Sequence, residues 1–317
     1  TLLGFTRPQL RDALVLLDAI DRQLVDLVGP ALAGDGKLVL FDAADTSVTR
    51  QVADAVEARA GALVREELGA LPEQDGRATS ELGAALGRRR ALFEGWEKAL
   101  APRGITLATP TSLDIQGDWR RELRPLVPPR ELAELERLEG TLTTPSSAAV
   151  FAAVRREIAA SIARHEVQHR LDYARPEPLR MPHALEELTG PVEQRGVERR
   201  PVARARAEMS AYLAQLARDE RTTRVDLTLV FRFLFDDSLA GTPESYAAVA
   251  IAEALSEELG AALDGPLVDR GRIVRDRAAR IWRRLVDAPQ GAIRAGARRA
   301  WERAFGEPLP PLRKRSP

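Results

Sequence analysis

The 317-residue chain contains no cysteine. Disulfide bonds, thiolate metal ligands and a cysteine nucleophile are therefore excluded. A chain without cysteine suits reducing and oxidising compartments alike, so composition does not separate the cytoplasm from an exported location. The sequence starts at Thr1 rather than at methionine, which fits the removal of a start or signal segment.

Long apolar runs and an excess of one charge are also missing. Residues 13–28 are the nearest approach to an apolar run, but four charged side chains interrupt them, whereas a membrane span needs about 18 apolar residues. The 47 basic and 47 acidic residues balance, which argues against a globally basic nucleic-acid-binding protein. With 44% hydrophobic and 30% charged residues, the composition is typical of a soluble globular chain.

Apolar residues recur at spacings of three and four through most of the chain, which predicts a mainly α fold with minor β structure. Thr144 and Pro145 form a typical helix start, with threonine as the N-cap and proline at the first helical position. Pro176 should end that helix near Arg175. The helices are expected over residues 8–28, 48–68, 80–100, 129–138, 144–175, 202–217, 243–259, 272–286 and 292–305.

Four other segments carry different patterns. Residues 37–41 (KLVLF) are strand-like, and 105–115 predict a loop or a short edge strand interrupted by proline. Residues 225–235 alternate like a strand, but their length also fits a buried helix. Residues 175–201 contain five prolines and two glycines, which predict an irregular surface connection.

The chain has three histidines, and two of them belong to the sequence HEVQH at 165–169, which matches H-E-x-x-H. On a helix, residues four apart share a face, so His165 and His169 can reach one metal ion. Glu166 projects beside them and can contact a metal-bound water. An apolar stripe leads into His165 at helical spacing, which places both histidines on the inward face. The alternative is a pair of core histidines with hydrogen-bonded partners.

Zinc needs a third protein ligand and an open position. A histidine six residues after His169 is excluded because Arg175 stands there, and His183 would need an unusual loop. Glu208 is the favoured ligand, because its small neighbours would let two helices approach closely. Arg204, one turn earlier, is expected to be its salt-bridge partner. The competing carboxylates are Asp172, Glu186, Glu187, Glu193 and Glu253.

With the HEVQH motif and Glu208, residues 144–216 resemble the gluzincin group of zinc metallopeptidases, which pair HExxH with a glutamate on a downstream helix. The resemblance implies a helical, zincin-like metallopeptidase with Zn²⁺ as cofactor and a peptide or protein as substrate. The two histidines and Glu208 would hold the zinc. Glu166 would take a proton from the zinc-bound water and pass it to the leaving amine.

The chain departs from many gluzincins at Tyr212, where they carry an aspartate that orients a histidine. Asp172, one turn after His169, is predicted to take part of that role by hydrogen bonding. Tyr212 shares a helix face with Glu208 and is predicted either to donate to a developing oxyanion or to be a core aromatic. His183 is predicted to contact the substrate, with plain exposure as the alternative.

These expectations divide the chain into an N-terminal helical subdomain, 1–143, and a catalytic region with a C-terminal helical bundle, 144–317. Two rival functions stay open. A zinc hydrolase acting on a non-peptide amide would use the same chemistry. A non-enzymatic binding protein could use residues 270–317, which carry a net charge of +10. The arginines there spread around their helix, however, which argues against nucleic-acid binding.

Overall fold

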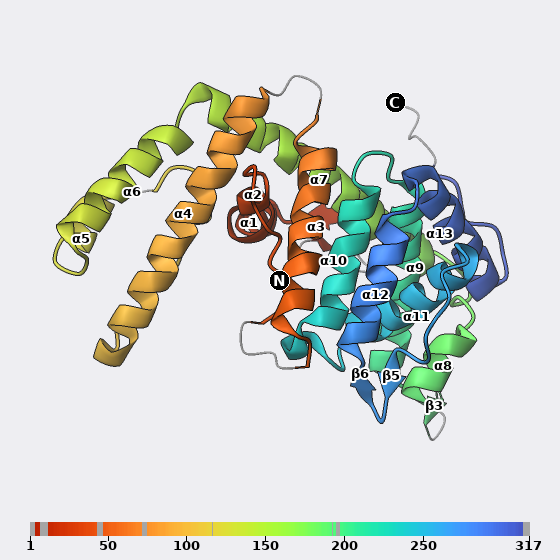
Figure 1. The fold of residues 1–317 in the computed structure, drawn as a ribbon. Coiled ribbons are helices and arrows are strands. Elements are labelled where there is room, and N and C mark those ends of the chain that lie inside the picture. The colour runs from red at the N-terminus through yellow and green to blue at the C-terminus, as the bar shows by residue number, and fades with distance from the viewer. Residues whose placement is uncertain are drawn as a thin grey trace. The chain divides into compact units, whose positions relative to one another are not determined.

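The computed structural model describes residues 4–6, 12–42, 47–71, 75–115, 117–191, 193–194 and 197–312 (Figure 1). Helices account for 68% of the structure and strands for 3%, which confirms the predicted mainly α fold. In the described part of the chain, no helix is both long enough and apolar enough to cross a membrane.

Within the described residues, the two-residue strands form three antiparallel pairs, β1–β2, β3–β4 and β5–β6. The elements are β1 (Gly4–Phe5), β2 (Leu14–Val15), α1 (Leu17–Gln23), the π-helical η1 (Leu24–Val28), α2 (Gly29–Ala31), α3 (Arg50–Leu68), α4 (Gly76–Leu100), the 3₁₀ turn η2 (Ala101–Arg103), α5 (Trp119–Leu123), α6 (Pro129–Leu142), α7 (Pro145–Tyr173), α8 (His183–Thr189), β3 (Glu193–Gln194), β4 (Val197–Glu198), α9 (Arg200–Arg218), α10 (Thr223–Phe235), the 3₁₀ turn η3 (Asp237–Leu239), α11 (Pro243–Glu258), β5 (Val268–Asp269), β6 (Arg272–Ile273), α12 (Arg275–Val286) and α13 (Gln290–Phe305).

The chain packs as two compact units, and it passes from one to the other more than once, including inside α3 and inside α7. Unit 1 takes Leu16–Val39 and Glu57–Ala160, and unit 2 takes Gly4–Val15, Leu40–Val56 and Ser161–Pro317. Helix α7 begins as predicted, because the Thr144 hydroxyl caps it by accepting the amide of Ser147 at 3.2 Å. Its second half, which carries the HEVQH motif, therefore belongs to unit 2.

In unit 1, helix α4 packs on α2 and α6. Arg89 of α4 is fully buried and pairs with Glu139 Oε1 at 3.1 Å. Its guanidinium also donates to the carbonyl oxygens of Ser112 (2.8 Å) and Leu113 (3.0 Å). These bonds fix residues 105–115, for which a loop or an edge strand was predicted, as a loop.

The strand predicted at 37–41 is wrong, and 225–235 resolves as helix α10. Leu38 and Leu40 are buried while Val39 is exposed, so the segment does alternate as a strand would. The Leu38 amide, however, donates to the carbonyl of Glu57 in helix α3 rather than to a strand. Alternating burial alone does not make a strand, because a strand also needs a neighbouring strand as partner.

In unit 2, helix α9 packs against α11 and α13, which also contact each other (Figure 1). Trp282 and Trp301 are fully buried and donate to Thr228 Oγ1 (3.1 Å) and Ser210 Oγ (3.0 Å), respectively. Each indole nitrogen thus keeps a hydrogen-bond partner in the core, which burial of an indole requires.

The basic C-terminal region is offset by acidic side chains of the same unit. Arg280 and Arg284 face Asp264 at 3.4 and 3.8 Å, and Arg299 pairs with Glu258 at 2.6 Å. Arg303 also pairs with Glu258. These ion pairs engage arginine charges that a nucleic-acid-binding surface would instead present to phosphates.

A buried carboxyl pair joins α7 to the turn between α9 and α10. Asp226 Oδ2 accepts from Ser161 Oγ at 2.7 Å and from Thr222 Oγ1 at 3.2 Å. Asp219 accepts from Arg164 at 2.7 Å and from two backbone amides. Burial and then the charge of Asp219 raise the pKa of Asp226 well above its ordinary value. Although burial opposes it, hydrogen bonds and Arg164 lower the pKa of Asp219. Asp226 is therefore the member of the pair that keeps its proton.

Wild type should lose stability as pH rises because Asp226 ionises, and we expect the Asp226→Asn variant to avoid this loss. Above about pH 4 the Asp226 carboxyl holds its proton more tightly in the folded state than in the unfolded state, so its contribution to stability falls as pH rises from there. Asparagine cannot ionise and still accepts at Oδ1. Between pH 5 and pH 8 the stability of the variant should therefore rise relative to that of wild type. Urea unfolding at both pH values measures this. The exposed Asp269→Asn should change nothing, and equal pH slopes for Asp226→Asn and wild type would contradict the assignment.

Candidate metal centre

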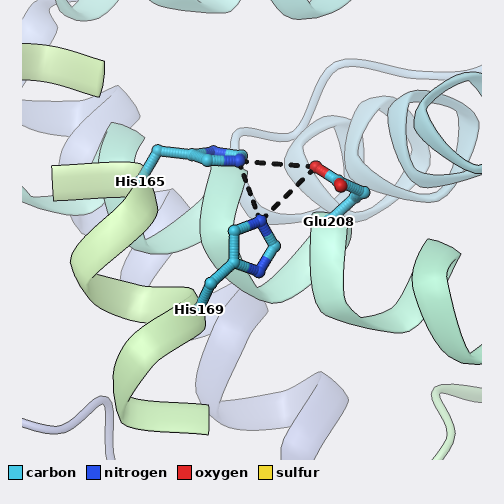
Figure 2. A group of neighbouring side chains, drawn as sticks. All are labelled: His165, His169 and Glu208. Carbon is cyan, nitrogen blue, oxygen red and sulfur yellow. Dashed lines mark hydrogen bonds and ion pairs between the residues drawn. The ribbon is translucent and has the colours of Figure 1, made fainter. Parts of the chain in front are cut away.

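The HEVQH motif lies in the last turns of α7, and Glu208 lies in the middle of α9. His165, His169 and Glu208 are only 8%, 6% and 9% exposed. Figure 2 shows the two imidazoles, one turn apart, pointing at the same carboxylate on the neighbouring helix. Within the described residues, these three make up the one group of three or more possible ligands whose ligand atoms converge, so none of the competing carboxylates joins it.

The three ligand atoms form a nearly regular triangle. His165 Nε2 and His169 Nε2 are 3.0 Å apart, and Glu208 Oε2 lies 3.4 Å from the first and 3.6 Å from the second (Figure 2). Bonds of about 2.0–2.1 Å in tetrahedral geometry place ligand atoms about 3.3 Å apart. The triangle therefore has the size that a tetrahedral metal ion requires, and two imidazoles with one carboxylate are a donor set typical of zinc.

Packing at this point follows from small residues on α9. Ala205 and Ala211 are fully buried on either side of Glu208 along the helix. They contribute little side-chain volume between α9 and its neighbours, as the sequence predicted. Glu208 can therefore extend across to the histidines while its backbone stays in a regular helix.

Electrostatics tie the three side chains together. Burial on its own would raise the pKa of Glu208, but hydrogen bonds and charge from the two histidines outweigh it and hold that pKa far below its ordinary value. Burial on its own would lower the pKa of His169, but the hydrogen bond and charge of the Glu208 carboxylate outweigh burial, so this pKa is raised. Glu208 therefore stays ionised, and the cluster favours a positive charge between its ligand atoms.

The outer nitrogens of the histidines differ from the inner ones. Nδ1 of His165 and Nδ1 of His169 are both buried and have no hydrogen-bond partner among the described residues. Asp172 follows one turn after His169, but its Oδ1 accepts from Gln168 Nε2 at 2.8 Å. Among the described residues, the hydrogen bond of Asp172 Oδ1 goes to Gln168 rather than to His169. The role of Asp172 in orienting His169 stays a prediction.

Glu166 stands beside the cluster and is 6% exposed. Strand β1 passes directly over its carboxyl group, because a Cβ built on Gly4 would lie 2.4 Å from Glu166 Cγ and from Oε1. A side chain at position 4 would therefore have to displace the Glu166 carboxyl group. Burial is the main cause that raises the pKa of Glu166, and the Glu208 charge adds to it, while the two histidines lower it. The contact with Gly4 left no signal in the sequence.

The predicted site residues Tyr212 and His183 divide between the site and the surface. The Tyr212 ring packs 4.5 Å from the His165 ring and 6.0 Å from Phe233, so it reaches the site as a packed aromatic, and its hydrogen-bonding role stays a prediction. His183 does not join the cluster; its side chain is 83% exposed and lies 3.1 Å from Glu187. It begins helix α8 rather than lying in the expected irregular connection, because Pro182 precedes it as the cap.

Sequence reasoning missed Tyr173 and Glu244. The Tyr173 ring stacks on His169, with centroids 6.2 Å apart and planes at 16°, and is 44% exposed. Its position four residues after His169 is a helical-face signal that could have found it. Glu244 reaches the site only through Arg204, at 2.8 Å. This contact joins two helices far apart in sequence, so spacing gives no sign of it.

No protein-family model, no curated protein and no solved structure matches this chain. The site therefore has to be interpreted from its own atoms.

Proposed function

We propose that this chain is a zinc-dependent metallopeptidase. The observation that carries the proposal is the convergence of His165 Nε2, His169 Nε2 and Glu208 Oε2 on one point, with Glu166 in the same turn of α7. Three protein ligands leave one position of a tetrahedral zinc open, which distinguishes catalytic sites from closed structural ones. The gluzincin resemblance of residues 144–216 agrees with this arrangement.

His165, His169 and Glu208 would hold the zinc. When bound, zinc would lower the pKa of a coordinated water toward about 7 and polarise the scissile carbonyl. The burial of all three ligands keeps bulk water from competing for them. The glutamate carboxylate also offsets part of the ion's charge, which a buried site requires.

Glu166 would carry the proton. Its carboxylate would accept a proton from the attacking water and deliver it to the nitrogen of the leaving amine. The Gly4 backbone packed on Glu166 limits the positions that the carboxyl group can take. Such restriction favours proton transfer, because a general base must lie within hydrogen-bond reach of the atom it deprotonates.

Casein and a mixed peptide library test the proposal directly. Cleavage should appear with the zinc-loaded protein, stop with a chelator and return with added zinc. If peptides resist while simple non-peptide amides are hydrolysed with the same zinc dependence, the chain is the other zinc hydrolase that the motif allows. Zinc-loaded protein that cleaves neither class would contradict the proposed chemistry.

A further inference from the structure

The two carboxylate oxygens of Glu208 face different partners. Oε2 lies between the two histidine nitrogens, at 3.4 and 3.6 Å. Oε1 is turned away from them and lies 3.7 Å from Arg204 Nε. Arg204 stands four residues earlier on α9, so its side chain lies along the same helix face as Glu208. One oxygen is thus directed at the metal position and the other at a guanidinium.

Arg204 is itself held from the other side. Its Nη2 donates to Glu244 Oε1 at 2.8 Å. Glu244 lies in the first turn of α11, a helix that packs on α9. The guanidinium is therefore anchored by Glu244 on a neighbouring helix, although the Arg204 side chain is 58% exposed. An anchored guanidinium can fix the orientation of Glu208, which a freely rotating one could not.

Resting on the metal site proposed above, we propose that Arg204 is a positioning residue that makes Glu208 bind the metal through Oε2 alone. A carboxylate can ligate with one oxygen or with both. The positive charge on Arg204, 3.7 Å from Oε1, attracts that oxygen and opposes its rotation toward the ion. The outer partners of a metal ligand set its orientation in this way. A second Glu208 oxygen on the metal would take the position that water and substrate need.

If Arg204 formed only an ordinary surface ion pair, a different result would be expected when it is replaced. Exposed pairs of this kind contribute little, and removing one would leave the coordination of the metal as it was. The two interpretations therefore differ in the coordination geometry of the bound metal, which can be measured without any substrate.

Cobalt(II) is the probe, because its visible absorption weakens when its coordination number rises above four. Wild type loaded with cobalt should show intense four-coordinate bands. Arg204→Gln should give weaker, shifted bands, and should bind zinc about tenfold less tightly, as loss of a ligand's partner typically does. Glu244→Gln should shift the bands in the same direction. Arg204→Lys should recover part of the wild-type spectrum, because it restores the charge.

Arg200→Gln is the matched control, since it removes the same charge one turn earlier on α9, and its spectrum should equal that of wild type. Unchanged bands and zinc affinity in Arg204→Gln would overturn the inference while leaving the metal site intact. Complete loss of cobalt from folded Arg204→Gln, verified by circular dichroism, would overturn it too, because Glu208 would then need Arg204 to bind at all. A wild type that binds neither cobalt nor zinc would overturn the proposed function and this inference together.

Discussion

Glu166→Gln is expected to abolish turnover and leave the metal content unchanged. Glutamine has nearly the shape of glutamate, so the close packing against Gly4 can persist. It cannot accept a proton, however, and removal of a general base lowers turnover by about 10²- to 10⁴-fold. The proposed ligands His165 and His169 are unaltered in this variant, so zinc should still bind.

The measurement is casein or peptide cleavage by zinc-loaded protein, with metal content determined on the same sample. Glu157→Gln is a suitable control, because it makes the same change earlier in α7 and should keep wild-type activity. Cleavage by Glu166→Gln at the wild-type rate would show that Glu166 does not carry the proton. Loss of zinc together with activity would show instead that Glu166 serves the metal.

Zinc is expected to raise the thermal unfolding midpoint of wild type, and Glu208→Ala should lose this response. A ligand that binds only the folded state stabilises it by about 2.7 kcal/mol at a hundredfold excess over Kd. For a chain of this size, that corresponds to a shift of roughly 4 °C. Without Glu208, two imidazoles remain, and two ligands hold zinc far more weakly than three.

Circular dichroism melts with zinc and with chelator measure the shift. The exposed Glu187→Ala on α8 should keep the wild-type response to zinc, because its side chain lies outside the cluster. A full zinc response in Glu208→Ala would remove Glu208 from the ligand set. Comparison of wild type with Glu208→Ala, both in chelator, measures the structural role of Glu208 apart from its role toward the metal.

Local signals in the sequence predicted the helical frame and the three converging residues. Thr144 and Pro145 carry their own start signal, since capping depends on neighbouring residues alone. The spacing of His165 and His169 holds on any helix. Glu208 could be singled out because small neighbours signalled a close approach of α9 to its neighbours.

Other features depend on contacts between distant segments, which spacing does not encode. The burial of residues 37–40 alternates as in a strand, but the partner of the Leu38 amide is a helix carbonyl. Gly4 and Glu166 lie close together in the fold although they are far apart in the sequence. The pair of Arg204 and Glu244 likewise depends on how α11 packs on α9. Each requires the assembled fold, so none could be predicted from sequence pattern.

Metal content is the most direct test of the central claim, that His165, His169 and Glu208 form a metal site. Mass spectrometry of protein purified without a histidine tag would measure it, beside His165→Ala. About one zinc per chain in wild type, lost in the variant, is the result expected of a three-ligand site. No metal in either protein, even after zinc is added back, would contradict the claim and leave the triangle of Figure 2 as a buried hydrogen-bonded cluster.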